Sequence, residues 1–149
     1  MSYKAILFGI LLLLTMHQVA SAQPATFASS GSGTQFGGSL SSAFAKFKDK
    51  PFTSLSDTML DAAVTLTIAT DPQFNDVIAT LQMMDYFDTG PSTGAFSFVQ
   101  NDGSNFGVFN GTFKTQGGLL TSFTGTLVEI FADGGFVIMT LKSGKQVVP

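Results

Sequence analysis

The sequence predicts a mainly β domain of the α+β class, in which an antiparallel meander of about four to six strands packs on one amphipathic helix. Two observations support this prediction. Beyond Gly90 the chain consists of short apolar runs separated by Gly-rich turn signals, and residues 71–84 carry apolar side chains at helical spacing. An all-β sandwich or barrel is the alternative fold class.

The first 22 residues are expected to be a cleavable secretory signal peptide. Lys4 precedes an unbroken apolar stretch, and Ala20 and Ala22 place small residues at the two positions that signal peptidase reads. The apolar stretch is shorter than the roughly 20 residues that a membrane-spanning helix needs. We therefore expect a mature chain that begins at Gln23, has no membrane span and is secreted, either extracellular or periplasmic.

Residues 23–39 are expected to form a flexible arm, because the segment is uncharged and rich in Gly and Ser. An ordered edge strand is the alternative. Phe27 and Phe36 stand out in this arm, since their apolar area stays in contact with water unless another surface covers it. They are the predicted association residues: the arm adds as a strand either to the chain's own sheet or to that of a neighbouring copy.

Residues 40–149 are expected to form a single β-rich domain. A short helix with Leu40, Phe44 and Phe47 on one face is expected before Pro51. In residues 64–68 apolar side chains alternate with Thr, which predicts a half-buried strand. A helix over residues 56–67 stays open as an alternative.

The main helix of the prediction follows Thr70. Asp71 is a favourable N-cap, and Pro72 suits the first helical position because its φ is already helical. Gly90 and Pro91 mark the far limit of this segment. The face expected to pack on the sheet consists of Phe74, Val77, Ile78, Leu81 and Met84.

Four antiparallel strands are expected beyond Gly90, within residues 95–99, 106–113, 119–131 and 136–141. Asp-Gly and Gly-Gly pairs between them are typical of hairpin turns, because these residues tolerate positive φ. A short internal similarity supports repeated strand units: residues 109–113 and 123–127 share Phe and Gly-Thr at matching positions.

The composition excludes most enzyme classes for the mature chain, which contains no His, Cys, Trp or Arg. Triads built on His or Cys, zinc sites and iron–sulfur clusters all need those side chains. Six Lys against nine Asp and one Glu give a net charge of −4, which argues against nucleic acid as a partner. We expect no catalytic residue, no cofactor and no metal site.

Three local features of the sequence have the composition of possible functional sites. Asp85 and Asp88 are a pair of carboxylates that could serve glycoside hydrolysis, although polar residues at the end of a helix are far commoner. Residues 101–105 are rich in oxygen ligands for Ca²⁺, but they lack the spacing of an EF-hand and favour a hairpin turn. Asn110 begins an Asn-Gly-Thr acceptor pattern for N-glycosylation.

These observations predict a secreted, non-enzymatic structural or interaction protein, such as a matrix, coat or adhesion subunit at the cell surface. Low charge and a sheet rich in aromatic residues favour association through β-edges and apolar surface, with itself or with another extracellular protein. The alternative is a soluble carrier that binds a small hydrophobic ligand in a pocket lined by Phe and Met.

Overall fold

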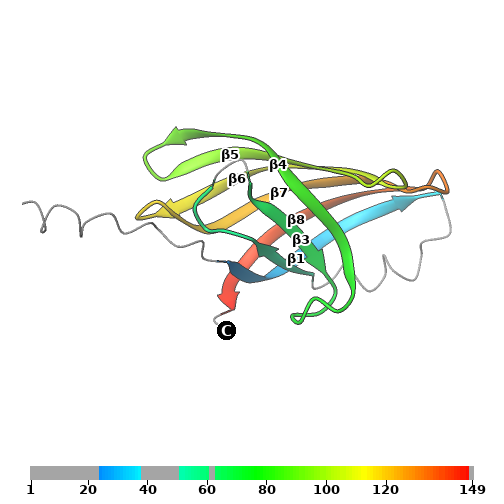
Figure 1. Ribbon diagram of the computed structural model, residues 1–149, viewed down its shortest axis with the longest axis horizontal. Helices are drawn as coiled ribbons and strands as arrows, with labels where there is room; N and C mark the ends of the chain where they lie inside the picture. The colour runs from blue at the N-terminus through cyan, green and yellow to red at the C-terminus, as the bar shows by residue number, and fades with distance from the viewer. Residues whose placement is uncertain (1–23, 38–50, 61–62, 148–149) are drawn as a thin grey trace, which may run out of the picture.

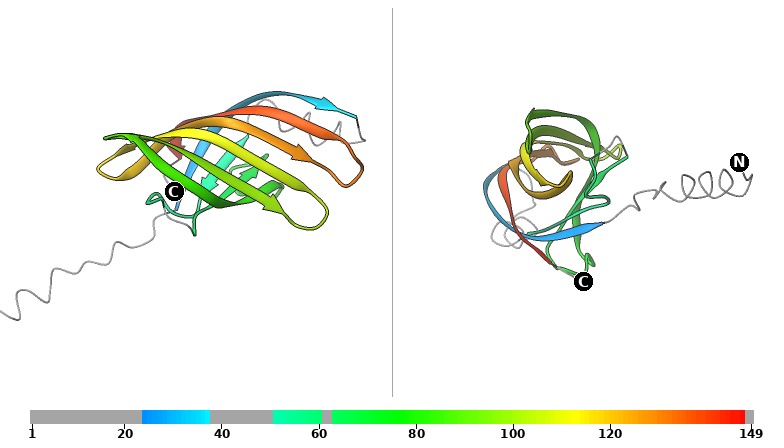
Figure 2. Two further views of the ribbon diagram at one scale, coloured as in Figure 1. Left: turned by 90° about the horizontal axis from the view of Figure 1, so that it is seen from above. Right: turned by 90° about the vertical axis from the view of Figure 1, so that its left-hand side faces the viewer.

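The computed structural model describes residues 24–37, 51–60 and 63–147, and these residues form a closed antiparallel barrel (Figure 1). Each strand pairs with the next along the chain, and the last pairs with the first. The end-on view in Figure 2 shows this ring of strands. The strands are β1 (Ala25–Phe36), β2 (Phe52–Leu55), β3 (Thr65–Ala69), β4 (Val77–Gly90), β5 (Thr93–Asn101), β6 (Phe106–Gln116), β7 (Leu119–Ile130) and β8 (Phe136–Val147).

The prediction of a sheet packed on a helix is wrong, because the segment assigned to that helix forms strand β4. Ala79, Leu81 and Met83 face the interior at every second position, whereas Met84 and Val77 of the expected helical face are exposed. The segment fits either period when taken alone. The segment forms a strand because it pairs with β3 on one side and with β5 on the other.

Asp71 begins a turn between β3 and β4 instead of capping a helix. Its carboxylate accepts hydrogen bonds from the backbone N–H groups of Gln73, Asn75 and Asp76 at 2.9–3.3 Å. An Asp carboxylate that accepts hydrogen bonds from several nearby backbone N–H groups is found both at helix N-caps and in tight turns. The local signal at Asp71 was therefore ambiguous between the two structures.

The segment expected as a flexible arm forms strand β1, which lies between β2 and β8 and closes the barrel. Its pairing with β8 extends from Thr26 opposite Val147 to Phe36 opposite Phe136. The Gly and Ser residues, which predicted a flexible arm, allow β1 to pack closely against β8. A side chain at Gly33 would collide with the backbone of Ile138 and Met139 on the neighbouring strand.

The other strand predictions agree with the structure. Residues 64–68 lie at β3, and the four strands expected beyond Gly90 are β5 to β8. Gly117 and Gly118 turn the chain between β6 and β7 with φ of 59° and 81°. The signal peptide expected in residues 1–22 and the short helix expected before Pro51 lie outside the described residues.

Aromatic rings fill much of the barrel interior. Six buried phenylalanines from β1, β5, β6 and β7 contact one another in pairs, with ring centroids 5.0–6.3 Å apart: Phe27, Phe96, Phe98, Phe109, Phe113 and Phe123. A chain without cysteine has no disulfide to restrict its unfolded state, so this buried apolar area is the main source of its stability.

Candidate functional site

The two predicted association residues lie on opposite faces of β1. Phe27 is completely buried in the barrel, where its ring meets the edge of Phe123 at a centroid distance of 5.6 Å. Phe36 is 44% exposed on the outer side and stacks on Phe136 at 4.8 Å. The structure therefore separates the pair, and only Phe36 is placed where another molecule could contact it.

Phe36 belongs to a larger apolar surface on the outside of four neighbouring strands. One row of paired residues runs across the sheet from Phe106 through Ile130 and Phe136 to Phe36, and the row beside it contains Val108, Val128 and Ile138. Phe106, Val128, Ile130 and Ile138 are also exposed. We call this surface the apolar face: Phe36, Phe106, Val108, Val128, Ile130, Phe136 and Ile138.

A row of neutral polar side chains borders the apolar face. The paired residues are Ser97, Asn110, Thr126, Thr140 and Ser32, on β5 to β8 and β1. Asn110, the predicted glycosylation acceptor, is exposed in this row, and its Oδ1 accepts a hydrogen bond from the Ser97 hydroxyl at 2.7 Å. No side chain of the apolar face or of this row carries a charge.

A second unusual feature is the carboxyl of Glu129 on β7. Its side chain is completely buried, and neither carboxylate oxygen has a hydrogen-bond partner. Desolvation and, to a smaller degree, the negative charge of Asp102 raise the pKa of Glu129 to about 7. A buried, unpaired acid of this kind costs stability, so its presence calls for a physical explanation.

Gln100 and Asp102 lie beside Glu129 at the same end of the barrel. Gln100 pairs with Gly107, which in turn pairs with Glu129 on the next strand. The amide nitrogen of Gln100 donates to Asp102 Oδ2 at 3.1 Å, and its amide oxygen accepts from the backbone N–H of Thr80 at 3.2 Å. Backbone pairing between β4 and β5 ends at Gln82 and Val99. Beyond this pair, the side chain of Gln100 links the two strands through its hydrogen bond with Thr80.

A groove of about 420 Å³ opens at this seam, and Gln100, Asp102, Thr80 and Asn105 contribute to its walls. Residues 102–105 form the hairpin turn between β5 and β6, with Gly103 at φ 85°. Hydrogen bonds from the backbone N–H groups of Asn105 and Ser104 and from the Gln100 side chain hold the pKa of Asp102 below its usual value.

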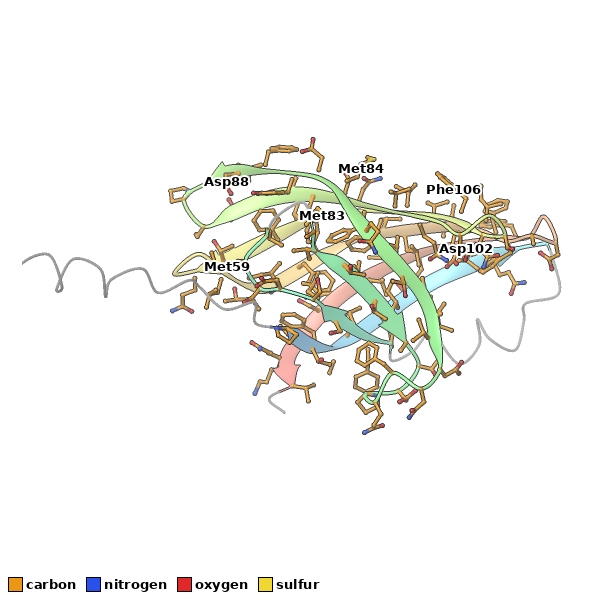
Figure 3. The ribbon with its side chains drawn as sticks, in the orientation of Figure 1. Met59, Met83, Met84, Asp88, Asp102 and Phe106 are labelled. Carbon is orange, nitrogen blue, oxygen red and sulfur yellow. The ribbon has the colours of Figure 1, made fainter. Side chains whose placement is uncertain are left out.

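A second groove of about 360 Å³ lies toward the opposite end of the sheet. Lys114 and Lys142 contribute to its walls together with the hydroxyls of Thr112, Ser122 and Thr124. Charge in the β6–β8 region is therefore divided, with lysines toward one end and Asp102 and Glu129 toward the other. Figure 3 shows Asp102 and Phe106 at one end of the barrel and Asp88 at the other.

The carboxylate pair Asp85 and Asp88 is exposed on β4, which replaces the expected helix end. Asp85 Oδ1 accepts a hydrogen bond from the backbone N–H of Tyr86 at 2.8 Å. Within the described part of the chain, no three Asp, Glu, His or Cys side chains gather as a metal site would require. In the same part of the chain, no helix is long and apolar enough to cross a membrane.

Sequence reasoning missed Glu129 as a residue of interest, although a signal was present. Glu129 is the only glutamate of the chain, and it follows Leu127 at the two-residue spacing that places strand side chains on one face. Since Leu127 is a natural core residue, the alternation placed Glu129 in the core as well. The strand predicted over residues 119–131 contains Glu129, but its alternation was not followed as far as this residue.

Comparison with known protein families, with characterised proteins and with solved structures gives no match to this chain.

Proposed function

We propose that the protein is a secreted, non-enzymatic interaction protein that associates with copies of itself through the apolar face. The observation that carries this proposal is the exposure of Phe36, Phe106, Val128, Ile130 and Ile138 on adjacent strands. Monomeric soluble proteins rarely expose contiguous apolar patches larger than roughly a few hundred Å², and such large patches commonly mark interaction sites.

Association is expected to use the outer face of the sheet. β1 pairs with both β2 and β8, so the described strands form a closed ring. Pairing with β2 covers only Ala25 to Ala28, so residues 29–36 of β1 keep one edge that pairs with no described strand. We expect contact through the outer face because the exposed apolar side chains lie there, and sheets that pack face to face lie about 10 Å apart with their side chains interdigitated.

The neutrality of the surface supports a second copy as the partner. A two-fold contact places the same patch on both subunits, so charges within it would face like charges. The apolar face and the polar row beside it have no charged side chain, and hydroxyl and amide groups can donate as well as accept hydrogen bonds. A partner with a charged patch would find no complementary group on this surface.

The strength of association is expected to be moderate. Each exposed side chain of the apolar face contributes on the order of 1 kcal/mol when it is covered, because part of its area is already buried in the monomer. Several such terms must offset the loss of translational and rotational freedom, which costs at least about 4 kcal/mol. A dissociation constant in the range of about 1–100 µM is therefore expected.

Sedimentation velocity of the secreted chain over a range of concentrations tests the proposal. We expect a dimer or larger assembly that Ile130→Lys and Ile138→Lys convert to a monomer with an unchanged melting temperature. Met84→Lys is the matched control, since Met84 is 64% exposed on β4, outside the apolar face. A wild-type chain that stays monomeric at all concentrations contradicts the proposal, and a monomer that carries an extractable small molecule favours the carrier function.

A further inference from the structure

The groove of about 360 Å³ at the lysine-bearing end of the sheet has walls with positive and neutral side chains. Its volume falls within the range of roughly 300–1,000 Å³ that is usual for small-molecule sites. Lys114 of β6 and Lys142 of β8 are exposed in its walls, and none of the described residues that line it is acidic. Asp88 directly precedes Thr89 of the lining, but it does not contribute to the walls itself. The groove therefore presents positive charge in a chain whose overall charge is negative.

Backbone pairing places the two lysines on either side of strand β7. Lys114 pairs with Ser122, and Lys142 pairs with Thr124, which lies on the same face of β7 as Ser122 because the two are two residues apart. Strands lie about 4.8 Å apart and rise about 3.4 Å per residue, so the Cα atoms of the two lysines are separated by about 12 Å. Their ammonium groups are carried on flexible four-carbon stems and can approach one ligand from both sides.

The hydrogen-bond donors of this groove are available to a ligand. Within the described ranges, no carboxylate pairs with Lys114 or Lys142, and the hydroxyls of Thr112 and Ser122 form no hydrogen bond with another residue. The Thr124 hydroxyl, in contrast, already donates to the backbone carbonyl of Leu141 at 3.1 Å. Two ammonium groups and two hydroxyls therefore remain, and all four can donate to the acceptor oxygens of an anion.

We propose that this groove binds an acidic polysaccharide through the sulfate or carboxylate groups of its sugars. The two lysines hold the oxyanion, and the neighbouring Thr and Ser hydroxyls exchange hydrogen bonds with the sugar hydroxyls, since a hydroxyl can both donate and accept. Nucleic acid is a poorer ligand, because its binding depends on many phosphate contacts and the groove offers only two positive charges on a negatively charged chain.

Affinity electrophoresis of the secreted chain in gels that contain dextran sulfate, carboxymethyl dextran or neutral dextran tests the site. The three polymers share one backbone, so they differ only in the charged group. We expect retardation, relative to a gel without polymer, by at least one of the acidic dextrans and none by neutral dextran. The stronger of the two acidic polymers identifies sulfate or carboxylate as the preferred group. Retardation should disappear at high NaCl concentration, because salt screens exposed charges.

Three lysine variants locate the binding. Lys114→Gln and Lys142→Gln should each lower the affinity for the acidic dextran about three- to fivefold, and the double variant about ten- to twentyfold, because exposed charge pairs are individually weak. Lys145→Gln is the matched control, since Lys145 is exposed on β8 outside the groove and its replacement removes the same charge. This variant should bind like the wild-type chain.

Four results would overturn the proposal. They are no retardation by either acidic dextran, equal retardation by neutral dextran, an equal loss of affinity in Lys145→Gln, and equally tight binding of a single-stranded DNA oligonucleotide, which would indicate a general affinity for polyanions. None of the residues that line the groove belongs to the apolar face. Sedimentation velocity therefore tests self-association separately, and the groove and the apolar face can fail independently of each other.

Discussion

Gly111 pairs with Gly125 across β6 and β7, and the absence of both side chains leaves the room that the rings of Phe96 and Phe109 occupy. The internal similarity between residues 109–113 and 123–127 has its explanation here, because the two segments pair with each other residue by residue. A Cβ at Gly125 would lie 2.5 Å from Phe109 Cζ and 2.8 Å from Gly111 Cα.

The first prediction follows from this close packing. Gly125→Ala should lower the free energy of unfolding by about 1–3 kcal/mol, because the added methyl group collides with the backbone oxygen of Asn110 on the paired strand and with the Phe109 ring. Gly107→Ala is the control, since its nearest neighbour would be 3.5 Å away, and it should be neutral or slightly stabilising. Urea denaturation at pH 6 measures the free energy of unfolding of both variants. Equal losses in the two variants would show that strand propensity, and not ring packing, determines the effect.

The second prediction concerns the pH dependence of stability. Burial raises the pKa of Glu129 from 4.5 to about 7, so the folded state keeps a proton that the unfolded state has already released. Stability should therefore fall as the pH rises from about 4.5 to 7, by about 3 kcal/mol in total, and then stay level. Glu129→Gln should remove this decrease and be the more stable protein at pH 8. Parallel curves for the two proteins over this window would contradict the assignment.

Below pH 4 the carboxylates whose pKa values are lowered in the folded state should act in both proteins, and Asp102 is one of them. Hydrogen bonds from the backbone N–H groups of Asn105 and Ser104 keep the pKa of Asp102 low in the folded state. The stability that they provide is present above the unfolded pKa and is lost as the pH falls through the folded pKa. Asp102→Asn should therefore reduce the acid sensitivity of the β5–β6 turn, which amide hydrogen exchange at Asn105 would detect.

The third prediction separates the two phenylalanines of β1. Phe27→Ala should cost about 3–5 kcal/mol of stability, because it opens a cavity beside Phe123. Phe36→Ala should cost at most about 1 kcal/mol, since the ring is partly exposed and loses only its stacking on Phe136. It should instead weaken self-association. Denaturant titration together with sedimentation velocity distinguishes the two effects, and a strongly destabilised Phe36→Ala would show that this ring belongs to the core.

The fourth prediction concerns the seam between β4 and β5. Gln100→Leu leaves the backbone N–H of Thr80 without its acceptor and should lower stability by about 1–2 kcal/mol, with faster amide exchange at Thr80. Gln82→Leu is the matched control, because Gln82 accepts only an exposed hydrogen bond from the Thr65 hydroxyl. If exchange at Thr80 stays slow in Gln100→Leu, another group must satisfy this N–H.

Local sequence signals determined the turns and most of the strands of this protein. Asp-Gly and Gly-Gly pairs placed the hairpins because only residues that tolerate positive φ fit there, as Gly103, Gly117 and Gly118 confirm. Alternation of Thr with apolar residues located β3, because successive side chains of a strand point to opposite faces of the sheet. The buried aromatic cluster also follows from the sequence, since a cysteine-free chain with fifteen Phe beyond the expected signal must bury many of them.

Tertiary structure decided the identity of β4, the order of β1 and the burial of Glu129. Val77 to Met84 satisfies both the helical and the strand period, and only its pairing with β3 and β5 selects the strand. The Gly- and Ser-rich β1 becomes ordered because β8, more than 100 residues later in the chain, supplies its hydrogen-bond partners. Glu129 loses contact with water only when the barrel closes around it. All three outcomes depend on contacts between segments distant in sequence, and local propensity contains no information about those contacts.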